Sequence, residues 1–217
     1  MSDKKIYSYE GQEAVVHWDG RLCIHYGDCS RAEGELFVNG RQPWCQPDLA
    51  SDGEIADVLR RCPTGALSAT LKGQPMNETP PAANEVTVSQ DGPLFVSGKL
   101  HIGGSAKGIA SDRMRAALCR CGLSANKPYC DNSHVSGGFK DSGAVGKSGN
   151  AGAQTGGKLS VSPAPNGPLL LKGNFSIRAA SGRLAWQGEK TALCRCGASS
   201  NKPFCDGSHK AAGFEAD

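Results

Sequence analysis

Apolar positions follow clear periods in the first 72 residues. Residues 13–18 (Glu-Ala-Val-Val-His-Trp) predict a β-strand, and residues 66–71 (Ala-Leu-Ser-Ala-Thr-Leu) predict a second, returning strand. Between them, Ser51-Asp-Gly-Glu54 has the form of a helix-capping box, and Pro63 ends the helix that this box opens. Apolar side chains recur along this helix at helical spacing, namely Ile55, Val58, Leu59 and Cys62. Residues 1–72 therefore predict a small α+β unit.

The pattern of the remaining chain is duplicated at an offset of 75 residues. Residues 92–98 (Gly-Pro-Leu-Phe-Val-Ser-Gly) align with residues 167–173 (Gly-Pro-Leu-Leu-Leu-Lys-Gly), and each predicts a strand opened by a Gly-Pro turn. The Gly-Phe pairs at 138–139 and 213–214 align in the same way. The repeated unit is strand, strand, cysteine loop, short helix and aromatic anchor. One unit is too small to bury its apolar face, so we expect two units to pack against each other.

Two segments have the composition of linkers. Residues 73–84 (Gly-Gln-Pro-Met-Asn-Glu-Thr-Pro-Pro-Ala-Ala-Asn) predict a connection between domains. Residues 141–157 are rich in Gly, Ser and Ala, which is typical of a flexible tether. The predicted domains are therefore residues 1–72, 85–140 and 158–217.

Composition makes cysteine the residue to explain. The 217 residues include 29 glycines and only 6% aromatics, so the chain has little bulk with which to build a large core, and it has ten cysteines. No apolar signal segment opens the sequence, and no stretch approaches the roughly 20 apolar residues that span a bilayer. We therefore expect a cytoplasmic protein with no membrane partner, whose cysteines are reduced metal ligands and not disulfides. The net charge of +3 is too small to predict a nucleic-acid partner.

A cysteine-histidine motif, C-x-C-x2-S-x3-P-x-C-D-x-S-H, occurs once in each repeat. Structural zinc sites more often space their cysteines as C-x2–4-C. In a C-x-C pair, an extended backbone points both thiolates to the same side, where they can share one iron. The third cysteine and the histidine are four residues apart, so one helical turn brings both to a second iron. The spacing therefore favours a two-iron cluster over a single zinc ion.

These residues resemble the CDGSH iron-sulfur domain, the family of mitoNEET, over residues 85–214. The first copy departs from the motif at Asn132, where the family has glycine, and we expect that site still to load. Tandem motifs resemble the monomeric type of the family, in which two modules pack through a β-sandwich with internal pseudo-twofold symmetry. The resemblance implies one [2Fe-2S] cluster per repeat. Its ligands would be Cys119, Cys121, Cys130 and His134 in the first set and Cys194, Cys196, Cys205 and His209 in the second set.

Neighbours of these ligands have predicted supporting roles. Asp131 and Asp206 stand where an N-cap would start the helix that carries the histidine. The hydroxyls of Ser124 and Ser199 are expected to donate to cluster sulfur, which would tune the reduction potential, or else to serve the turn.

The N-terminal cysteines resemble those of divergent single-cluster ferredoxins over residues 1–72. The resemblance carries over three ligands, Cys23, Cys29 and Cys62, while Tyr26 occupies the position of a usual fourth cysteine. Three options stay open: a [3Fe-4S] cluster, a [4Fe-4S] cluster with a fourth ligand from His25 or Cys45, or a four-iron cluster with an open iron. We expect Cys45 to be a buried free cysteine and His25 to orient the site.

Electron transfer is the leading predicted function. Histidine is the one ligand that titrates near neutral pH, so the clusters are expected to couple reduction to protonation and to be lost in acid. The alternatives are a protein that stores or donates iron-sulfur clusters and a structural zinc module. No catalytic constellation stands out, so we expect a monomer that is not an enzyme and that meets redox partners or apo-protein acceptors.

Overall fold

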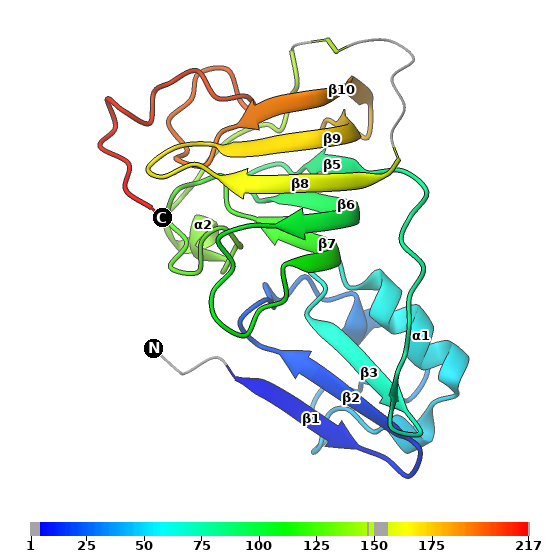
Figure 1. Cartoon of the computed structure of the whole chain (residues 1–217). Helices are drawn as coiled ribbons and strands as arrows, with labels where there is room; N and C mark the ends of the chain where they lie inside the picture. Colours follow the sequence, from blue (N-terminus) through cyan, green and yellow to red (C-terminus); the bar gives the residue numbers. More distant parts are fainter. Residues whose placement is uncertain (1–4, 147, 150–155, 217) are drawn as a thin grey trace. The chain divides into compact units, whose positions relative to one another are not determined.

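The computed structural model describes residues 5–146, 148–149 and 156–216, and Figure 1 shows the whole chain. The chain divides into two compact units, Met1–Thr79 and Pro80–Asp217. The described residues combine many strands with few helices, which confirms the α+β class. Within the described ranges, no helix has the length and hydropathy needed to cross a membrane.

The first unit is an antiparallel sheet in the order β1-β2-β3-β4 with one covering helix. The predicted strands are present as β2 (Ala14–Asp19) and β3 (Leu67–Leu71), and the predicted helix is α1 (Asp52–Arg61). Strands β1 (Ile6–Glu10) and β4 (Gln74–Pro75) were not predicted, and β4 lies inside the segment predicted as a linker. Two short 3-10 helices, η1 and η2, complete the unit at Cys29–Arg31 and Pro47–Leu49.

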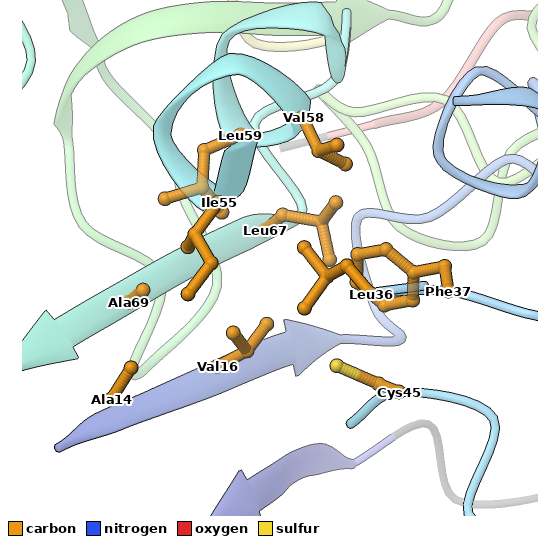
Figure 2. Close-up of a cluster of buried hydrophobic side chains, with 10 residues drawn as sticks. All are labelled: Ala14, Val16, Leu36, Phe37, Cys45, Ile55, Val58, Leu59, Leu67 and Ala69. Carbon is orange, nitrogen blue, oxygen red and sulfur yellow. The ribbon is translucent and has the colours of Figure 1, made fainter. Parts of the chain in front are cut away.

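The capping box and the apolar face of α1 explain how this unit closes. Ser51 Oγ accepts the Glu54 amide at 3.3 Å, and the Glu54 carboxylate accepts the Ser51 amide at 2.7 Å. Figure 2 shows the apolar face of α1 over the sheet, where Val16 is fully buried. The buried cluster consists of Ala14, Val16, Leu36, Phe37, Cys45, Ile55, Val58, Leu59, Leu67 and Ala69. Each fully buried aliphatic side chain stabilises the unit by about 1.5–3 kcal/mol.

The second unit is a six-stranded sheet built from the two repeats. The first repeat supplies β5 (Glu85–Val88), β6 (Leu94–Ile102) and β7 (Asp112–Leu118), followed by α2 (Ser133–Ser136). The second repeat supplies β8 (Lys158–Pro163), β9 (Leu169–Arg178) and β10 (Leu184–Leu193). The predicted Gly-Pro strands at 92–98 and 167–173 are the beginnings of β6 and β9. Figure 1 shows β8 lying beside β6 and β9.

Strand pairing in this sheet is reciprocal between the repeats. Strand β5 pairs antiparallel with β6 of its own repeat and parallel with β9 of the other. Strand β8 pairs antiparallel with its own β9 and parallel with β6. The pair Val86↔Ile177 becomes Val161↔Ile102 when 75 is added to one number and subtracted from the other. The apolar faces of the two repeats are therefore buried in one sheet system, as the small size of a single repeat led us to expect.

Both predicted linkers contain residues with defined contacts. Asn84 is 1% exposed, and its side chain donates to the carbonyl oxygens of Gly157 and Asn174. In the segment 141–157, the described part includes Asp141, which pairs with Arg120, and Val145, which is 3% exposed. Residues 147 and 150–155 of that segment lie outside the described residues.

Candidate metal centres

The two cysteines of each C-x-C pair lie just beyond the end of a strand. In the first set, Cys119 follows β7, and its amide donates to Pro128 at 2.9 Å. In the second set, Cys194 follows β10, and its amide donates to Pro203 at 2.8 Å. The extended backbone brings the two sulfurs of each pair together, as the spacing predicted. The Sγ atoms are 3.7 Å apart in Cys119–Cys121 and in Cys194–Cys196.

The third cysteine and the histidine of each set form a second pair. Cys130 Sγ lies 3.4 Å from His134 Nδ1, and His134 belongs to the single turn of α2. Cys205 Sγ lies 3.5 Å from His209 Nδ1 in the second set. In both sets, the imidazole therefore presents Nδ1 to the cysteine.

These separations fit donors that share one tetrahedral metal. Two sulfurs on one such metal are about 3.7 Å apart when each bond is about 2.3 Å, and a sulfur and a nitrogen are about 3.5 Å apart. Each set of four donors is grouped as two pairs, one with two sulfurs and one with a sulfur and a nitrogen. Among the residues that the structure describes, no group of three or more His, Cys, Asp or Glu is placed to hold a single ion.

The aspartates hold the cysteine-histidine turn by hydrogen bonds, although neither is the N-cap of a helix in the described residues. Asp131 Oδ1 accepts the Ser133 amide at 3.0 Å, and Oδ2 accepts the Ala125 amide at 2.8 Å. Asp206 accepts the equivalent amides of Ser208 and Ser200, and a hydrogen bond from the Ser208 side chain, followed by these amide bonds, lowers the pKa of its carboxyl group. The N-cap of α2 is Asn132, with φ of 76° and no side-chain capping bond. Each aspartate therefore connects the histidine turn to the loop after the C-x-C pair.

Of the two roles predicted for the serines, the structure shows the one in the turn. Ser124 Oγ donates to the Tyr129 carbonyl at 2.6 Å and accepts the Asn126 amide at 3.0 Å. Ser199 makes the equivalent bonds with Phe204 and Asn201. The single hydroxyl hydrogen is thus committed to a backbone carbonyl, and both serines, which are fully buried, hold the loop together.

An arginine stands between the two cysteines of each C-x-C pair, and sequence reasoning missed it. Arg120 is 1% exposed, and its Nε donates to the Gly92 carbonyl at 2.7 Å. Its guanidinium also pairs with Asp141 and lies 5.0 Å from the Phe139 ring centroid. Each arginine therefore ties its C-x-C loop to the Gly-Pro turn and to the aromatic anchor. In the second set the corresponding groups are Arg195, the Gly167 carbonyl and the Phe214 ring. The sequence signal for this arginine is that C-R-C occurs in both repeats.

The two sets approach each other through their loops. Cys121 and Cys196 form an antiparallel β-bridge. The glycines that follow have positive φ, 83° at Gly122 and 82° at Gly197. A Cβ on Gly122 would lie 2.5 Å from the Cys196 carbonyl oxygen, and one on Gly197 would lie 2.5 Å from that of Cys121. Glycine is therefore required at both positions by backbone conformation and by close approach.

Burial differs between the sets. All four residues of the first set are buried, with exposures from 1% at Cys119 to 9% at His134. In the second set Cys194 is buried, whereas Cys196, Cys205 and His209 are half-buried. The second set is therefore more accessible to water.

Protonation of the thiols and the first imidazole follows from hydrogen bonding and burial. The hydrogen bond between the two thiols lowers the pKa of Cys119 to about 6 and raises the pKa of Cys121. Burial raises the pKa of Cys194 and lowers the pKa of His134. A neutral imidazole with a free lone pair is the form that binds a metal, so burial keeps His134 ready for ligation.

The N-terminal cysteines line a cavity of about 390 Å³. Cys23, Cys29 and Cys62 are all in its wall, together with His25 and Tyr26. Burial is the largest cause that raises the pKa of Cys29 to about 11, and the charges of Cys62 and Cys23 add to it. The remaining wall residues are Tyr9, Trp18, Ile24, Gly27, Asp28, Ser30, Asn39, Trp44, Pro63 and Thr64.

Cys45 belongs to the apolar core of this unit. It is 1% exposed among the clustered side chains of Figure 2, and its backbone bridges to Phe37. Burial raises the pKa of this thiol to about 12. His25 differs from Cys45 because it faces the cavity, has a positive φ of 54°, and donates its amide to Cys23 Sγ at 3.4 Å.

Comparison with protein families matches residues 91–135 and 166–210 to the iron-binding zinc finger of CDGSH type. Residues 9–72 match the divergent 4Fe-4S mono-cluster family. The chain belongs to both families. Each CDGSH match contains one complete set, and the 4Fe-4S match contains Cys23, Cys29 and Cys62.

Curated relatives match a shorter part of the chain. YjdI of Escherichia coli strain K12, an uncharacterized protein, is 37% identical over 59 residues, which cover 27% of this chain and 78% of YjdI. YjdI of Escherichia coli O157:H7 matches with the same identity and coverage. No solved structure matches the chain. The CDGSH and 4Fe-4S domains together identify an iron-sulfur protein.

Proposed function

We propose that this CDGSH protein carries three iron-sulfur clusters and transfers electrons. A [2Fe-2S] cluster would be held by each CDGSH set, and a third cluster by Cys23, Cys29 and Cys62. The observation that carries the proposal is the grouping of each set into two donor pairs, with separations of 3.4 to 3.7 Å. Two pairs suit two irons, and an iron-sulfur cluster supplies one-electron redox chemistry.

We also propose that the two CDGSH repeats are related by an internal pseudo-twofold axis. The reciprocal pairing of β5 with β9 and of β8 with β6 supports this relation. So does the bridge between Cys121 and Cys196, since those residues are equivalent at the offset of 75. The two sets would then belong to one rigid sheet system.

The histidines give the proposed clusters a dependence on pH. Replacing a thiolate ligand by a neutral imidazole removes negative charge and raises the reduction potential. Acid protonates the imidazole and competes with the metal for Nδ1, so the clusters should be lost as the pH falls. Protonation and reduction both favour a weaker iron-histidine bond, which is why the two should be coupled.

The third cluster would use the three cysteines of the cavity as ligands, either as [3Fe-4S] or as [4Fe-4S]. The core position of Cys45 supports its predicted role as a free cysteine. His25 is the neighbouring side chain that faces the cavity, so it remains the candidate for orienting the cluster or for a fourth bond.

Cluster donation is a second candidate function, and one observation favours it. Cys196, Cys205 and His209 are half-buried, so an apo-protein acceptor could reach the second set more easily than the first. In either role we propose a monomeric carrier that meets redox proteins or cluster acceptors, and not an enzyme.

The ultraviolet-visible spectrum and the metal content of freshly purified protein test the proposal. We expect a coloured protein with iron and acid-labile sulfide. A colourless protein with stoichiometric zinc would support the structural zinc module in place of the iron-sulfur carrier. Mixing the holoprotein with an apo-ferredoxin then separates the two roles, because only a donor loses its colour to the acceptor.

A further inference from the structure

Four lysines form a row on the outer face of the CDGSH sheet. They are Lys99 on β6, Lys158 on β8, Lys172 on β9 and Lys190 on β10, and all four are exposed. Lys99 is directly opposite Lys158, and Lys172 is directly opposite Lys190. Ser160, two residues after Lys158, is opposite Lys172 and joins the two pairs. Figure 1 shows these strands side by side.

A groove of about 430 Å³ opens beside the row. Lys158, Lys172 and Lys190 line it, together with Gly156, Gly157, Gly173, Asn174 and Glu189. Asp112 is a second acidic group that senses the charge of the row. A hydrogen bond from His101 is the largest cause that lowers the pKa of Asp112, and the charges of Lys158 and Lys99 also contribute. The row therefore keeps an excess of positive charge.

The arrangement is unfavourable for the isolated sheet. Like charges directly opposite each other on paired strands are destabilising. Neighbouring strands are about 4.8 Å apart, which is within the Debye length of about 8 Å at physiological ionic strength. The four ammonium groups therefore repel one another, and a bound anionic surface would relieve that repulsion.

The fold does not require these lysines. At the offset of 75 residues, the positions equivalent to Lys99, Lys158, Lys172 and Lys190 are occupied by Asn174, Ala83, Ser97 and Arg115. The pairing equivalent to Lys172↔Lys190 is Ser97↔Arg115, and it forms with a single charged residue. The row is a property of one side of the sheet system and not of the repeat.

Charge is also divided unevenly along the chain. Residues 80–217 contain 16 Lys and Arg against nine Asp and Glu, whereas residues 1–79 contain eight against 12. The basic surplus therefore resides in the CDGSH unit. Complementary potentials guide association and set its dependence on salt.

We propose that the lysine row docks the acidic face of a partner protein. Lys190 and Cys194 are four residues apart at the end of β10, so the row ends about 13 Å from the second set. A protein docked there lies next to the more accessible set. Exchange of electrons or clusters at this place rests on the proposed function, but the docking itself does not.

The test measures binding to a small acidic [2Fe-2S] ferredoxin by calorimetry at low and at physiological salt. The variant replaces all four lysines, Lys99→Gln, Lys158→Gln, Lys172→Gln and Lys190→Gln, in the holoprotein. We expect the affinity to fall about tenfold or more and its dependence on salt to flatten. A control variant carries Lys5→Gln, Lys72→Gln, Lys107→Gln and Lys140→Gln, which makes the same change in charge at exposed positions outside the row.

Two results would overturn the docking proposal. One is a loss of affinity in the row variant that does not exceed the loss in the control variant. The other is stronger binding of the unaltered protein to single-stranded DNA or to anionic vesicles, with loss in the row variant, since the row would then be a site for another class of partner. Calorimetry measures binding and requires no transfer of electrons or clusters. Binding without any transfer would therefore contradict the proposed function but leave the docking proposal intact.

Discussion

At the scale of single residues, the glycine after each C-x-C pair is the most constrained position of the site. Its φ is positive, and its Cα faces the carbonyl of the other repeat. In the sequence, this glycine is visible only as a Cys-Gly that occurs in both repeats. Glycine is required there because the two sets form a bridge, which no local pattern reveals.

Gly122→Ala should destabilise the CDGSH unit strongly. An alanine at positive φ costs about 1–2 kcal/mol, and the clash with the Cys196 carbonyl adds a comparable cost. Gly138→Ala is the matched control, since Gly138 also has positive φ but has no atom within 4 Å of the added Cβ. In thermal unfolding of the holoproteins, the fall in Tm caused by Gly122→Ala should be at least twice the fall caused by Gly138→Ala. Equal shifts would mean that the close approach is unimportant.

The histidine ligands should control loss of the clusters in acid. Burial lowers the pKa of His134, so its neutral form persists below the ordinary value of about 6.5, and the stability linked to this form is lost as the pH falls from about 6.5 through the lowered pKa. His209 is more exposed, so we expect the second set to lose its cluster first. Visible absorbance should therefore decay faster at pH about 5.5 than at pH about 8, in two phases.

Replacing the ligand histidines should reverse this behaviour. His134→Cys and His209→Cys substitute a thiolate, which lowers the reduction potential and slows the decay in acid. His17→Cys is the control, because His17 lies on β2 and bonds to Ser8 outside the CDGSH sets. Unchanged decay in both ligand variants would remove histidine from the proposed chemistry.

At the scale of elements, α1 is the best-specified part of the fold. The sequence predicted its capping box, its apolar face and its end before Pro63, and the structure confirms all three. The sequence did not predict β1, because this strand forms by pairing with β2. It did not predict β4, because that strand has only two residues. The parallel pairings of β5 with β9 and β8 with β6 join distant segments, so no local period could predict them.

Removing the cap should weaken α1 without affecting the CDGSH sheet. Ser51→Ala deletes the acceptor for the Glu54 amide and should cost about 1 kcal/mol of stability in the first unit. Hydrogen exchange of the α1 amides would report it, with Ser181→Ala, an exposed serine of the second unit, as control. Unaltered protection of α1 in Ser51→Ala would show that packing alone sets the stability of the helix.

At the scale of the whole molecule, the candidate centres were predictable to different degrees. The donor pairs followed from spacing, because C-x-C and C-x3-H fix local geometry. The role of Arg120 did not follow from spacing, since it depends on a carbonyl that the fold supplies, and for Ser124 the sequence left two roles open. The sequence also could not predict the difference in burial between the sets, because the two motifs are nearly identical in sequence.

The central claim is that each CDGSH set holds its own two-iron cluster. Electron paramagnetic resonance of the oxidised and the dithionite-reduced protein, with quantified spins, tests it most directly. We expect two reduced [2Fe-2S] signals per chain, of which Cys130→Ala removes one and Cys205→Ala the other. A protein that shows no [2Fe-2S] signal on reduction, or whose signal is indifferent to both substitutions, would contradict it.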